Sequence, residues 1–243
     1  MNRDGKGVLI VTPTYNEREN LEELIGGVRG ALPHAAMLIV DDASPDGTGA
    51  LAEEIAARDP LVHILHREAK LGLGSAYLDG FRYGLERDFT AFVQMDADGS
   101  HDPAYLPAFI ERLIEGNDLV IGSRNIPGGG VEGWGAGRHA LSKGGSVYSR
   151  LLLGLEIRDL TSGFKAMRRS LLEALPLSAI RSEGYSFQIE LSYRASEIGA
   201  KIVEHPIVFV DRRAGQSKMS RAIFLEAIWM VPSLRLRGLR GSL

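Results

Sequence analysis

Short apolar runs rich in β-branched residues recur through the first half of the chain, and a segment with helical spacing follows each one. The expected strands span residues 8–12, 37–40, 62–65, 90–95 and 118–122. Their apolar character is continuous rather than alternating, which is typical of strands buried on both faces. The repeated strand–helix order therefore predicts an α/β fold, with a mainly parallel sheet and helices on both of its faces.

Capping residues and helical spacing place the other elements. A helix is expected to begin near Glu17, capped by Asn16 or Thr14, and another at Pro103, capped by Asp102. Further helices are expected over residues 48–58, 75–87, 138–153 and 185–198, and extended segments over 159–166 and 201–210. The glycine-rich residues 125–137 are expected to form a mobile loop that acts as a lid, the alternative being a plain linker.

Two acids follow the fourth expected strand, where the chain leaves the sheet. Asp96 and Asp98 come directly after this apolar run, and the next residues cannot continue a strand. Side chains two apart in an extended segment point the same way, so this pair can share one divalent cation, Mg²⁺ or Mn²⁺. The alternative is a polar turn that only closes a strand.

Polar or acidic residues also follow the first two expected strands. Tyr15 and Glu17 come after the first, and Asp41 and Asp42 after the second. The carboxyl ends of parallel strands meet at one edge, where open α/β sheets bind ligands, and a carboxylate there suits a ribose hydroxyl or a base edge. Because both the Gly-x-Gly-x-x-Gly fingerprint and the P-loop are missing, a cation and basic side chains must neutralise any phosphates.

Five basic residues in expected loops or near loop ends are candidates for binding those phosphates. They are Arg124, Arg138, Arg212, Arg213 and Lys218. Arg138 and Ser142 are four residues apart on an expected helix, so together they can hold an anionic group. The alternative for each of them is a solvated surface charge.

Composition limits the class of protein. The chain has 243 residues, 44% of them hydrophobic, which is enough for one large domain or a domain plus an appendage. Its net charge of −3 argues against bulk binding of nucleic acid. With no cysteine, it has no thiol nucleophile, thiolate metal site or disulfide. No uncharged apolar run approaches the roughly 20 residues that cross a bilayer.

The C-terminal part differs in character from the rest. Residues 222–234 form an apolar helix-like run that contains Trp229, and Arg235, Arg237 and Arg240 follow. An apolar helix with a basic flank is typical of an interfacial membrane anchor. We therefore expect a catalytic domain over residues 1–220 and an amphipathic, basic, membrane-associating tail over 221–243. The alternative is a helix that packs on the domain's own core.

Several of these segments occur in an order that resembles the dolichyl- or polyprenyl-phosphate mannose synthases, within the GT-A glycosyltransferases of family 2. The resemblance covers about residues 7–220 and rests on Pro13-Thr14-Tyr15-Asn16-Glu17, on residues 41–48, 72–77, 94–98, 122–124, 159–165 and 184–191, and on the spacing of Phe209, Arg212, Gly215, Ser217 and Lys218. It implies a Rossmann-like GT-A fold.

The resemblance also implies roles for residues at matching positions. Those expected to hold the guanosine of GDP-mannose are Pro13, Tyr15, Glu17, Val40 and Asp42. Asp96, Ala97 and Asp98 would meet the diphosphate and its metal, and Arg124, Arg212 and Lys218 the phosphates or the sugar. Arg138 and Ser142, with Arg124, would hold the lipid phosphate. Ser100 takes the place of a third metal ligand, where some members carry glutamine. Asp96, Asp98 and Arg124 are the expected catalytic residues.

The implied reaction is inverting transfer of mannose from GDP-mannose to a polyprenyl monophosphate. The acceptor phosphate is ionised near neutral pH, its second pKa being about 6, so no carboxylate base is expected. The expected place is the cytoplasmic face of a membrane, with a small membrane-anchoring protein as a further candidate partner. Alternatives are a polyprenyl-phosphate glucosyltransferase or other family-2 transferase, a haloacid-dehalogenase-type phosphatase with Asp96 as nucleophile, and a non-catalytic sugar-nucleotide-binding or membrane-scaffold protein.

Overall fold

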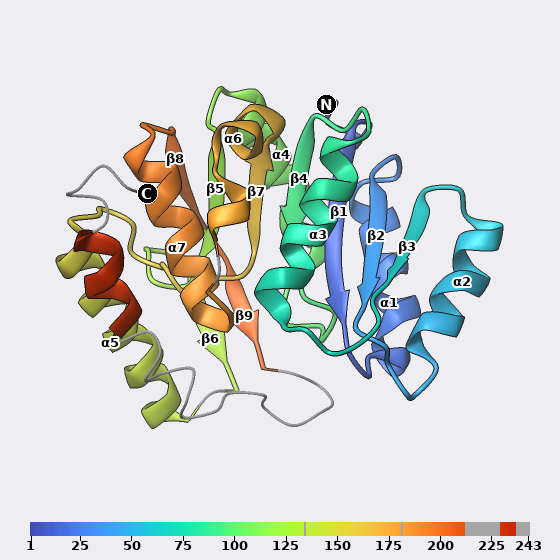
Figure 1. Ribbon diagram of the computed structural model, residues 1–243, viewed down its shortest axis with the longest axis horizontal. Helices are drawn as coiled ribbons and strands as arrows, with labels where there is room; N and C mark the ends of the chain where they lie inside the picture. Colours follow the sequence, from blue (N-terminus) through green and yellow to red (C-terminus); the bar gives the residue numbers. More distant parts are fainter. Residues whose placement is uncertain (134, 181, 212–228, 237–243) are drawn as a thin grey trace.

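The computed structural model describes residues 1–133, 135–180, 182–211 and 229–236 (Figure 1). Its strands are β1 (Val8–Thr14), β2 (Ala36–Asp41), β3 (Val62–His66), β4 (Ala91–Gln94), β5 (Leu119–Ser123), β6 (Gly130–Glu132), β7 (Lys165–Arg168), β8 (Ile202–Pro206) and β9 (Val208–Val210). Its α-helices are α1 (Arg18–Ala31), α2 (Thr48–Arg58), α3 (Leu73–Leu85), α4 (Leu106–Ile114), α5 (Ala136–Leu153), α6 (Arg169–Ala174) and α7 (Gly184–Glu197). Two 3₁₀ turns are η1 (Pro103–Tyr105) and η2 (Leu177–Ala179).

Seven strands form one sheet in the order β3-β2-β1-β4-β7-β5-β8. All neighbouring pairs are parallel except those of β7, which runs antiparallel to both β4 and β5. The chain moves from β1 outwards to β2 and β3 and then returns to place β4 on the other side of β1. This reversal is a topological switch point, where side chains beyond the carboxyl ends of β1 and β4 border a crevice.

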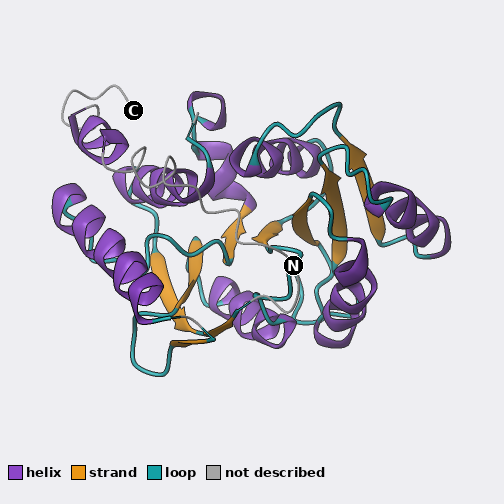
Figure 2. Ribbon diagram, turned by 90° about the horizontal axis from the view of Figure 1, so that it is seen from below, coloured by secondary structure: helices purple, strands orange, loops and turns teal. Residues whose placement is uncertain are grey.

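The sheet is covered on both faces, as the apolar runs predict. Along β1, Leu9 and Val11 pack with α3, α6 and α7, while Val8 and Ile10 pack with α1, α2 and α4. Successive side chains of a strand point to opposite faces, and all four of these side chains are fully buried. Both faces of β1 are therefore covered. Figure 2 shows helices on both sides of the central strands. The predicted α/β class with a mainly parallel sheet is therefore confirmed.

The expected strands and helices of the first half are confirmed within a few residues, and α2 has the expected bounds. The cap of α1 differs from the prediction. Neither Asn16 nor Thr14 caps this helix, and the Arg18 N–H instead donates to Asp46 Oδ2 at 3.2 Å, from the loop after β2. At η1 the expected cap is present, because Asp102 accepts from the Ala104 N–H.

The second half departs further from the predictions. The expected extended segment over residues 159–166 is wrong in its bounds, since β7 begins at Lys165, and the segment over 201–210 is divided into β8 and β9. Part of the glycine-rich segment is not a loop but strand β6, which pairs with β9. A Cβ at Gly129 would lie 2.4 Å from the Ser123 carbonyl oxygen, so glycine here permits close backbone approach.

Residues 229–236 are helical and pack on the same domain. Val231 and Leu234 are buried in the apolar cluster that also holds Leu153, and Arg235 donates to the Leu153 carbonyl oxygen. Trp229, in contrast, is 79% exposed. The described part of the expected tail thus packs on the core through one side, as the alternative interpretation required, and membrane association stays a prediction. Residues 221–228 and 237–243 lie outside the described part.

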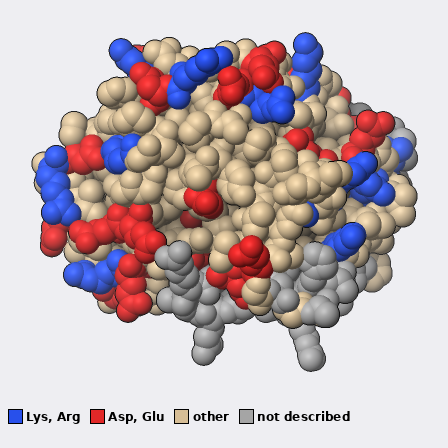
Figure 3. Space-filling view, turned by 180° about the vertical axis from the view of Figure 1, so that it is seen from behind, with Lys and Arg blue, Asp and Glu red and all other residues tan. Residues whose placement is uncertain are grey.

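Charged side chains of both signs are interspersed on the face shown in Figure 3, over much uncharged surface. Lys and Arg do not gather into one basic patch on the part of this face that the structure describes. This distribution matches the small net charge of −3.

Candidate functional site

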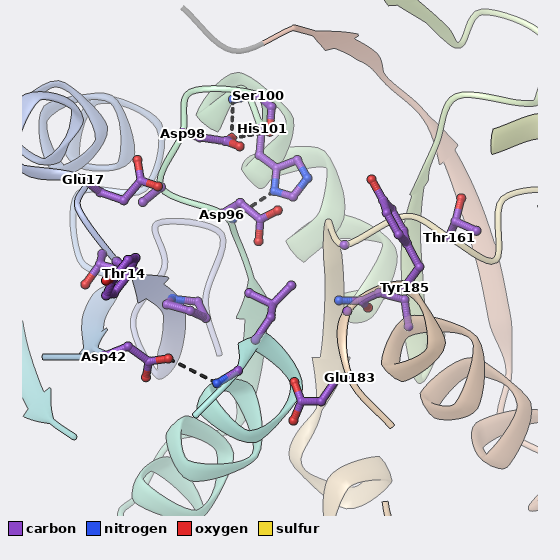
Figure 4. A pocket seen from close by; sticks show the side chains of 18 of the residues that line it. Thr14, Glu17, Asp42, Asp96, Asp98, Ser100, His101, Thr161, Glu183 and Tyr185 are labelled. Atoms are coloured by element: carbon purple, nitrogen blue, oxygen red, sulfur yellow. Dashed lines mark hydrogen bonds between the residues drawn. The ribbon is translucent and has the colours of Figure 1, made fainter. Parts of the chain in front are cut away.

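A cavity of about 370 Å³ opens at the switch point, beyond the carboxyl ends of β1, β2 and β4. Figure 4 shows polar side chains from both halves of the chain directed into it. The lining residues are Pro13, Thr14, Tyr15, Glu17, Asp42, Lys70, Gly72, Leu73, Asp96, Ala97, Asp98, Ser100, His101, Arg124, Thr161, Gly163, Glu183, Gly184, Tyr185, Gln188 and Phe209. The three strand ends that the sequence singled out therefore meet in one place.

Asp42 lies on the wall formed by the first half of the chain. Its Oδ1 is 2.5 Å from Nη1 of Arg67, and both side chains are buried. Its Oδ2 accepts from the backbone N–H groups of Leu71 and Gly72. Asp42 thus lines the cavity while its charge is balanced by a protein cation, so it orders the loop after β3.

The neighbouring Asp41 holds loops together beneath this wall. Its Oδ1 accepts hydrogen bonds from the hydroxyls of Thr14 at 2.9 Å and Ser44 at 2.5 Å. The loop after β2 in turn supports the loop after β1, because Ser44 accepts from the Asn16 N–H and Thr48 from the Glu17 N–H. Much of the polar motif at residues 41–48 therefore joins two strand ends and fixes the positions of Tyr15 and Glu17.

Asp96 and Asp98 line the cavity, but the geometry expected for them is wrong. Strand β4 ends at Gln94 and residues 97–99 bend, so the two carboxylates do not share the direction of an extended strand. The Tyr77 hydroxyl donates to Asp96 Oδ1 at 2.7 Å. Asp98 Oδ1 accepts from the N–H and the hydroxyl of Ser100 (Figure 4). Burial, followed by the nearby Asp96, raises the pKa of Tyr77 well above its usual value.

His101 stabilises the acidic turn, which is the bend that carries Asp96 and Asp98. Its ring is buried and stacks on Phe164, with ring centroids 4.8 Å apart and an interplanar angle of 11°. Its Nδ1 accepts a hydrogen bond from the Asp96 N–H at 2.9 Å, which requires that nitrogen to be unprotonated. The sequence showed His101 only as part of a turn; its role in fixing the backbone of Asp96 depends on Phe164, which is distant in sequence.

Arg124 lines the opposite wall with its guanidinium already paired. It forms a two-pronged contact with Asp159, through Nε and Nη2 at 2.7 Å each, and Nη2 also donates to Thr161. Burial alone would lower the pKa of Arg124 and raise that of Asp159, but each charge shifts the other in the opposite direction, so the Arg124 pKa is raised and the Asp159 pKa lowered. This expected phosphate ligand thus belongs to a neutral pair.

Two further contacts involve residues that line the cavity, and the first of them joins its two halves. Glu183, from the start of the α7 region, accepts from the N–H groups of Gly74 and Ser75 and so caps α3. On the first wall, Nζ of Lys70 lies 4.0 Å from the centroid of the Tyr15 ring. The sequence did not mark Glu183 or Lys70, because each partner is brought close only by the fold.

A further buried pair that the sequence did not reveal consists of Gln188, which lines the wall that carries Arg124, and Lys165, which lies behind it. Nζ of Lys165 donates to Gln188 Oε1 and to the Gln188 backbone oxygen, at 2.8 Å each. Burial lowers the pKa of Lys165 to about 7. The signal that was available is a single charge inside the apolar run Phe164-Lys165-Ala166-Met167.

The remaining expected residues lie outside the cavity wall or outside the described part. Val40 is fully buried in β2 and is not a lining residue. Ser142 is half-buried on α5, one turn before Ser146, whose hydroxyl lies 3.4 Å from that of Thr161. The side chain of Arg138, and all of Arg212, Arg213 and Lys218, lie outside the described part.

No cluster of three or more His, Asp or Glu that could by itself hold a metal occurs among the described residues. The two carboxylates expected to bind a cation, those of Asp96 and Asp98, both line the cavity. This set suits Mg²⁺ or Mn²⁺, because such ions are commonly bound by one or two carboxylates together with substrate phosphates. Among the helices that the structure describes, none combines the length and the apolar character that a membrane span requires.

The family model described as "Glycosyl transferase family 2" matches residues 9–175. The chain is 49% identical to an undecaprenyl-phosphate mannosyltransferase of Micrococcus luteus, over 97% of this chain and 98% of the relative. It is 50% identical to a polyprenol monophosphomannose synthase of Mycolicibacterium smegmatis, over 97% of this chain and 89% of that protein.

A more distant relative and a solved structure extend the comparison. A dolichol-phosphate mannosyltransferase of Pyrococcus furiosus is 38% identical, over 90% of this chain and 61% of the relative. The crystal structure of glucosyl-3-phosphoglycerate synthase from Mycobacterium tuberculosis with Mn²⁺, UDP-glucose and phosphoglyceric acid superposes with a TM-score of 0.70 at 21% identity. It covers 96% of this chain and 81% of that one. This last similarity concerns the fold.

Proposed function

This chain belongs to glycosyl transferase family 2 and, within it, to the polyprenyl-phosphate mannose synthases, and from that premise we propose that it transfers mannose from GDP-mannose to a polyprenyl monophosphate. The main support is the identity of about half of the residues with two such relatives over nearly their full lengths. Three strand–helix units precede β4, whereas the haloacid-dehalogenase phosphatases carry their acidic motif on the first strand, so that alternative is set aside.

We place the nucleoside of the donor against the first wall. Pro13, Tyr15 and Glu17 line it, and the loop after β2 holds them in place. Because the charge of the Asp42 carboxylate is balanced by Arg67, we propose that Asp42 mainly orders this wall and contributes less as a charged contact to the nucleotide base. Val40 is buried, so its contribution is limited to the backbone of β2.

We place the diphosphate beside the acidic turn, together with a divalent cation. Asp98 is its carboxylate ligand, because Ser100 orients one of its oxygens; Ala97 lines the same turn, and Asp96 faces the part of the cavity near Gly163. A bound Mg²⁺ or Mn²⁺ would neutralise the charge that grows on the GDP leaving group. Hydrogen bonds from the hydroxyls of Tyr77 and Ser100 orient the two carboxylates of this turn.

The acceptor phosphate supplies its own nucleophile. One of its oxygens forms the bond to the anomeric carbon on the face opposite the breaking bond to GDP, which inverts the configuration, and no proton has to be removed. Thr161 and Arg124 line this side, and Ser142 lies on the same helix as Ser146, which contacts Thr161. Because Arg124 is neutralised by Asp159, we assign the excess positive charge for the phosphates to Arg138, Arg212 and Lys218.

We also propose that the protein lies at the cytoplasmic face of a membrane as a peripheral protein, with a small anchoring protein as a candidate partner. Leu151 on α5 is 72% exposed, and Trp229 and Leu236 of the C-terminal helix are 79% and 54% exposed. Figure 1 shows α5 and this helix at the same end of the molecule. Changing Leu151 and Trp229 together to Ser should reduce flotation of the full chain with anionic liposomes, whereas Ile198→Ser, at an exposed site directly after α7, should not. Equal flotation of all three proteins would contradict this assignment.

The function is tested with a panel of nucleotide sugars and a labelled-sugar assay, in which transfer into polyprenyl phosphate is followed in the lipid phase. We expect transfer from GDP-mannose, a β-linked product and loss of activity in EDTA. Asp98→Ala should abolish transfer and weaken GDP-mannose binding only when Mg²⁺ or Mn²⁺ is present. Preferential use of UDP-glucose would show that the transferred sugar is glucose and not mannose. Full activity in EDTA would contradict the dependence on a metal.

A further inference from the structure

Gln188 places an unpartnered hydrogen-bond donor in the wall of the cavity. The residue is 2% exposed, and it lines the cavity from α7. Within the described part of the chain, its Nε2 has no hydrogen-bond partner. A buried donor left without a partner is costly, so a group that recurs at this place in the working protein is expected to accept from it.

Lys165 fixes which end of the amide faces the cavity. Nζ donates to Gln188 Oε1 at 2.8 Å and to the backbone oxygen of the same residue at 2.8 Å. A lysine nitrogen has no acceptor to offer in its charged form, so a flipped amide would set N–H groups against N–H groups. With its pKa near 7, Lys165 exchanges a proton around neutrality, and either form keeps the two N–H groups that these contacts need.

The Nε2 of Gln188 shares a small space with an acceptor. A Cβ built at Gly163 would lie 3.6 Å from Gln188 Nε2, 3.6 Å from Asp96 Oδ2 and 3.5 Å from His101 Cε1. Glycine leaves this point without a side chain, and one donor and one anionic acceptor lie close to it. A hydroxyl fits this pair, since it can donate to the carboxylate and accept from the amide. A phosphate oxygen would be repelled by Asp96.

We propose that Gln188 binds a hydroxyl group of the sugar that is transferred, and that Lys165 is the positioning residue that holds the Gln188 amide in the required orientation. Asp96 accepts from the same hydroxyl, and Gly163 provides the room for it. This inference rests on the proposed function, because it requires a nucleotide sugar in the cavity, and it adds a determinant of sugar specificity to the site.

The experiment compares GDP-mannose with its 2-, 3-, 4- and 6-deoxy analogues, through kcat/KM with a fixed polyprenyl phosphate. In the wild-type protein, one analogue should be slower by about ten-fold or more, because it leaves the Gln188 donor and Asp96 without their partner. Gln188→Leu should lower the value for GDP-mannose by about ten-fold and leave that analogue within about two-fold, so that the preference for the hydroxyl is lost.

Lys165→Met should weaken the same preference by about three- to ten-fold, since the amide is then free to flip. Gln94→Leu is the matched control. Gln94 is also a buried glutamine, and its side chain has no hydrogen-bond partner among the described residues, but it does not line the cavity. The Gln94→Leu variant should therefore keep the wild-type preference for the hydroxyl. If Gln188→Leu does not fold, Gln188→Glu replaces it in this test, because Glu keeps an acceptor for Lys165 but lacks the amide donor.

Three results would overturn the inference: no deoxy analogue is penalised in the wild type, Gln188→Leu or Gln188→Glu lowers kcat/KM for all donors by the same factor, or Gln94→Leu loses the preference as well. Failure of the proposed function gives a different result, namely a wild-type protein that does not use GDP-mannose. In that case the deoxy series is made for the nucleotide sugar that is turned over, and the same comparison decides.

Discussion

Asp42 follows β2 and Asp96 follows β4, on either side of β1 at the same edge of the sheet, yet their surroundings differ. Asp42 is paired with the buried guanidinium of Arg67 and accepts two backbone N–H groups. Asp96 accepts from the neutral Tyr77 hydroxyl, and no ion pair with it is present among the described residues. Position at a strand end therefore does not by itself give an acid a chemical role. The charge of Asp42 is balanced by Arg67, whereas Asp96 has no ion-pair partner within the described part of the chain.

Asp42→Ala should give the largest effect, and on stability. It leaves Arg67 buried without its main partner, and breaking a buried pair typically costs about 3–5 kcal/mol. We expect the lower end of that range, because Asp79 Oδ2 remains 3.2 Å from Arg67 Nε. Urea unfolding measures the loss, and the double variant Asp42→Leu with Arg67→Met should recover part of it. An unchanged unfolding free energy for Asp42→Ala would contradict the structural role.

Asp96→Asn should show the opposite pattern. We expect transfer to fall by about 10²–10³-fold, the usual cost of removing one electrostatic contact to a transition state, while the unfolding free energy changes by less than about 1 kcal/mol. Steady-state rates and urea unfolding of the same sample report both quantities. Asp102→Asn, in the same loop but exposed and acting as a helix cap, is the control and should keep wild-type activity. A stable and fully active Asp96→Asn protein would remove the contrast with Asp42.

Tyr77→Phe tests the hydroxyl that holds Asp96. Its ring stacks on Phe187 with centroids 6.1 Å apart, and this packing is kept in the variant. A hydrogen bond to a charged group is worth about 1.5–3 kcal/mol, which predicts a loss of about 10- to 150-fold in kcat/KM. Tyr193→Phe is the control, because the buried Tyr193 hydroxyl has no partner among the described residues. Additive effects of Tyr77→Phe and Asp96→Asn would show that the two groups act separately.

Lys165→Met tests the smallest expected effect, which is a change in how the unfolding free energy depends on pH. Between pH 7 and 10.5 the unfolded chain keeps the Lys165 proton and the folded chain releases it, so the unfolded state binds more protons and stability rises with pH. Lys165 adds at most about 1.4 kcal/mol per pH unit to the slope of the unfolding free energy with pH. This slope falls to zero below pH 7, where both states are protonated. Urea unfolding at pH 7, 8 and 9 should show this slope in the wild type relative to the variant; parallel curves would contradict the lowered pKa.

The strands, their parallel order and their shared edge followed from the sequence because burial on two faces leaves continuous apolar runs, as in residues 8–12 and 37–40. The partners of the polar groups did not follow. Arg67, Tyr77 and Asp159 contact residues 25, 19 and 35 positions away, and no local pattern encodes those pairings. The extended geometry assumed for Asp96 and Asp98 failed for a related reason. Strand β4 ends two residues before Asp96, and the bend that follows is stabilised by two hydrogen bonds, from the Asp96 N–H to His101 Nδ1 and from the Ser100 N–H to Asp98 Oδ1.

The antiparallel strand β7 has a consequence for how the protein folds. It lies between β4 and β5, although it follows both of them and α5 in the chain. Strands β4 and β5 therefore have no sheet partner in common until residues 165–168 have left the ribosome, and the sheet forms in two parts that β7 joins. Such late, non-local pairing slows folding. Helix α7, whose Gln188 lines the cavity, also follows β7 in the chain, so a chain interrupted before β7 lacks both the strand that joins the two parts of the sheet and this part of the cavity wall.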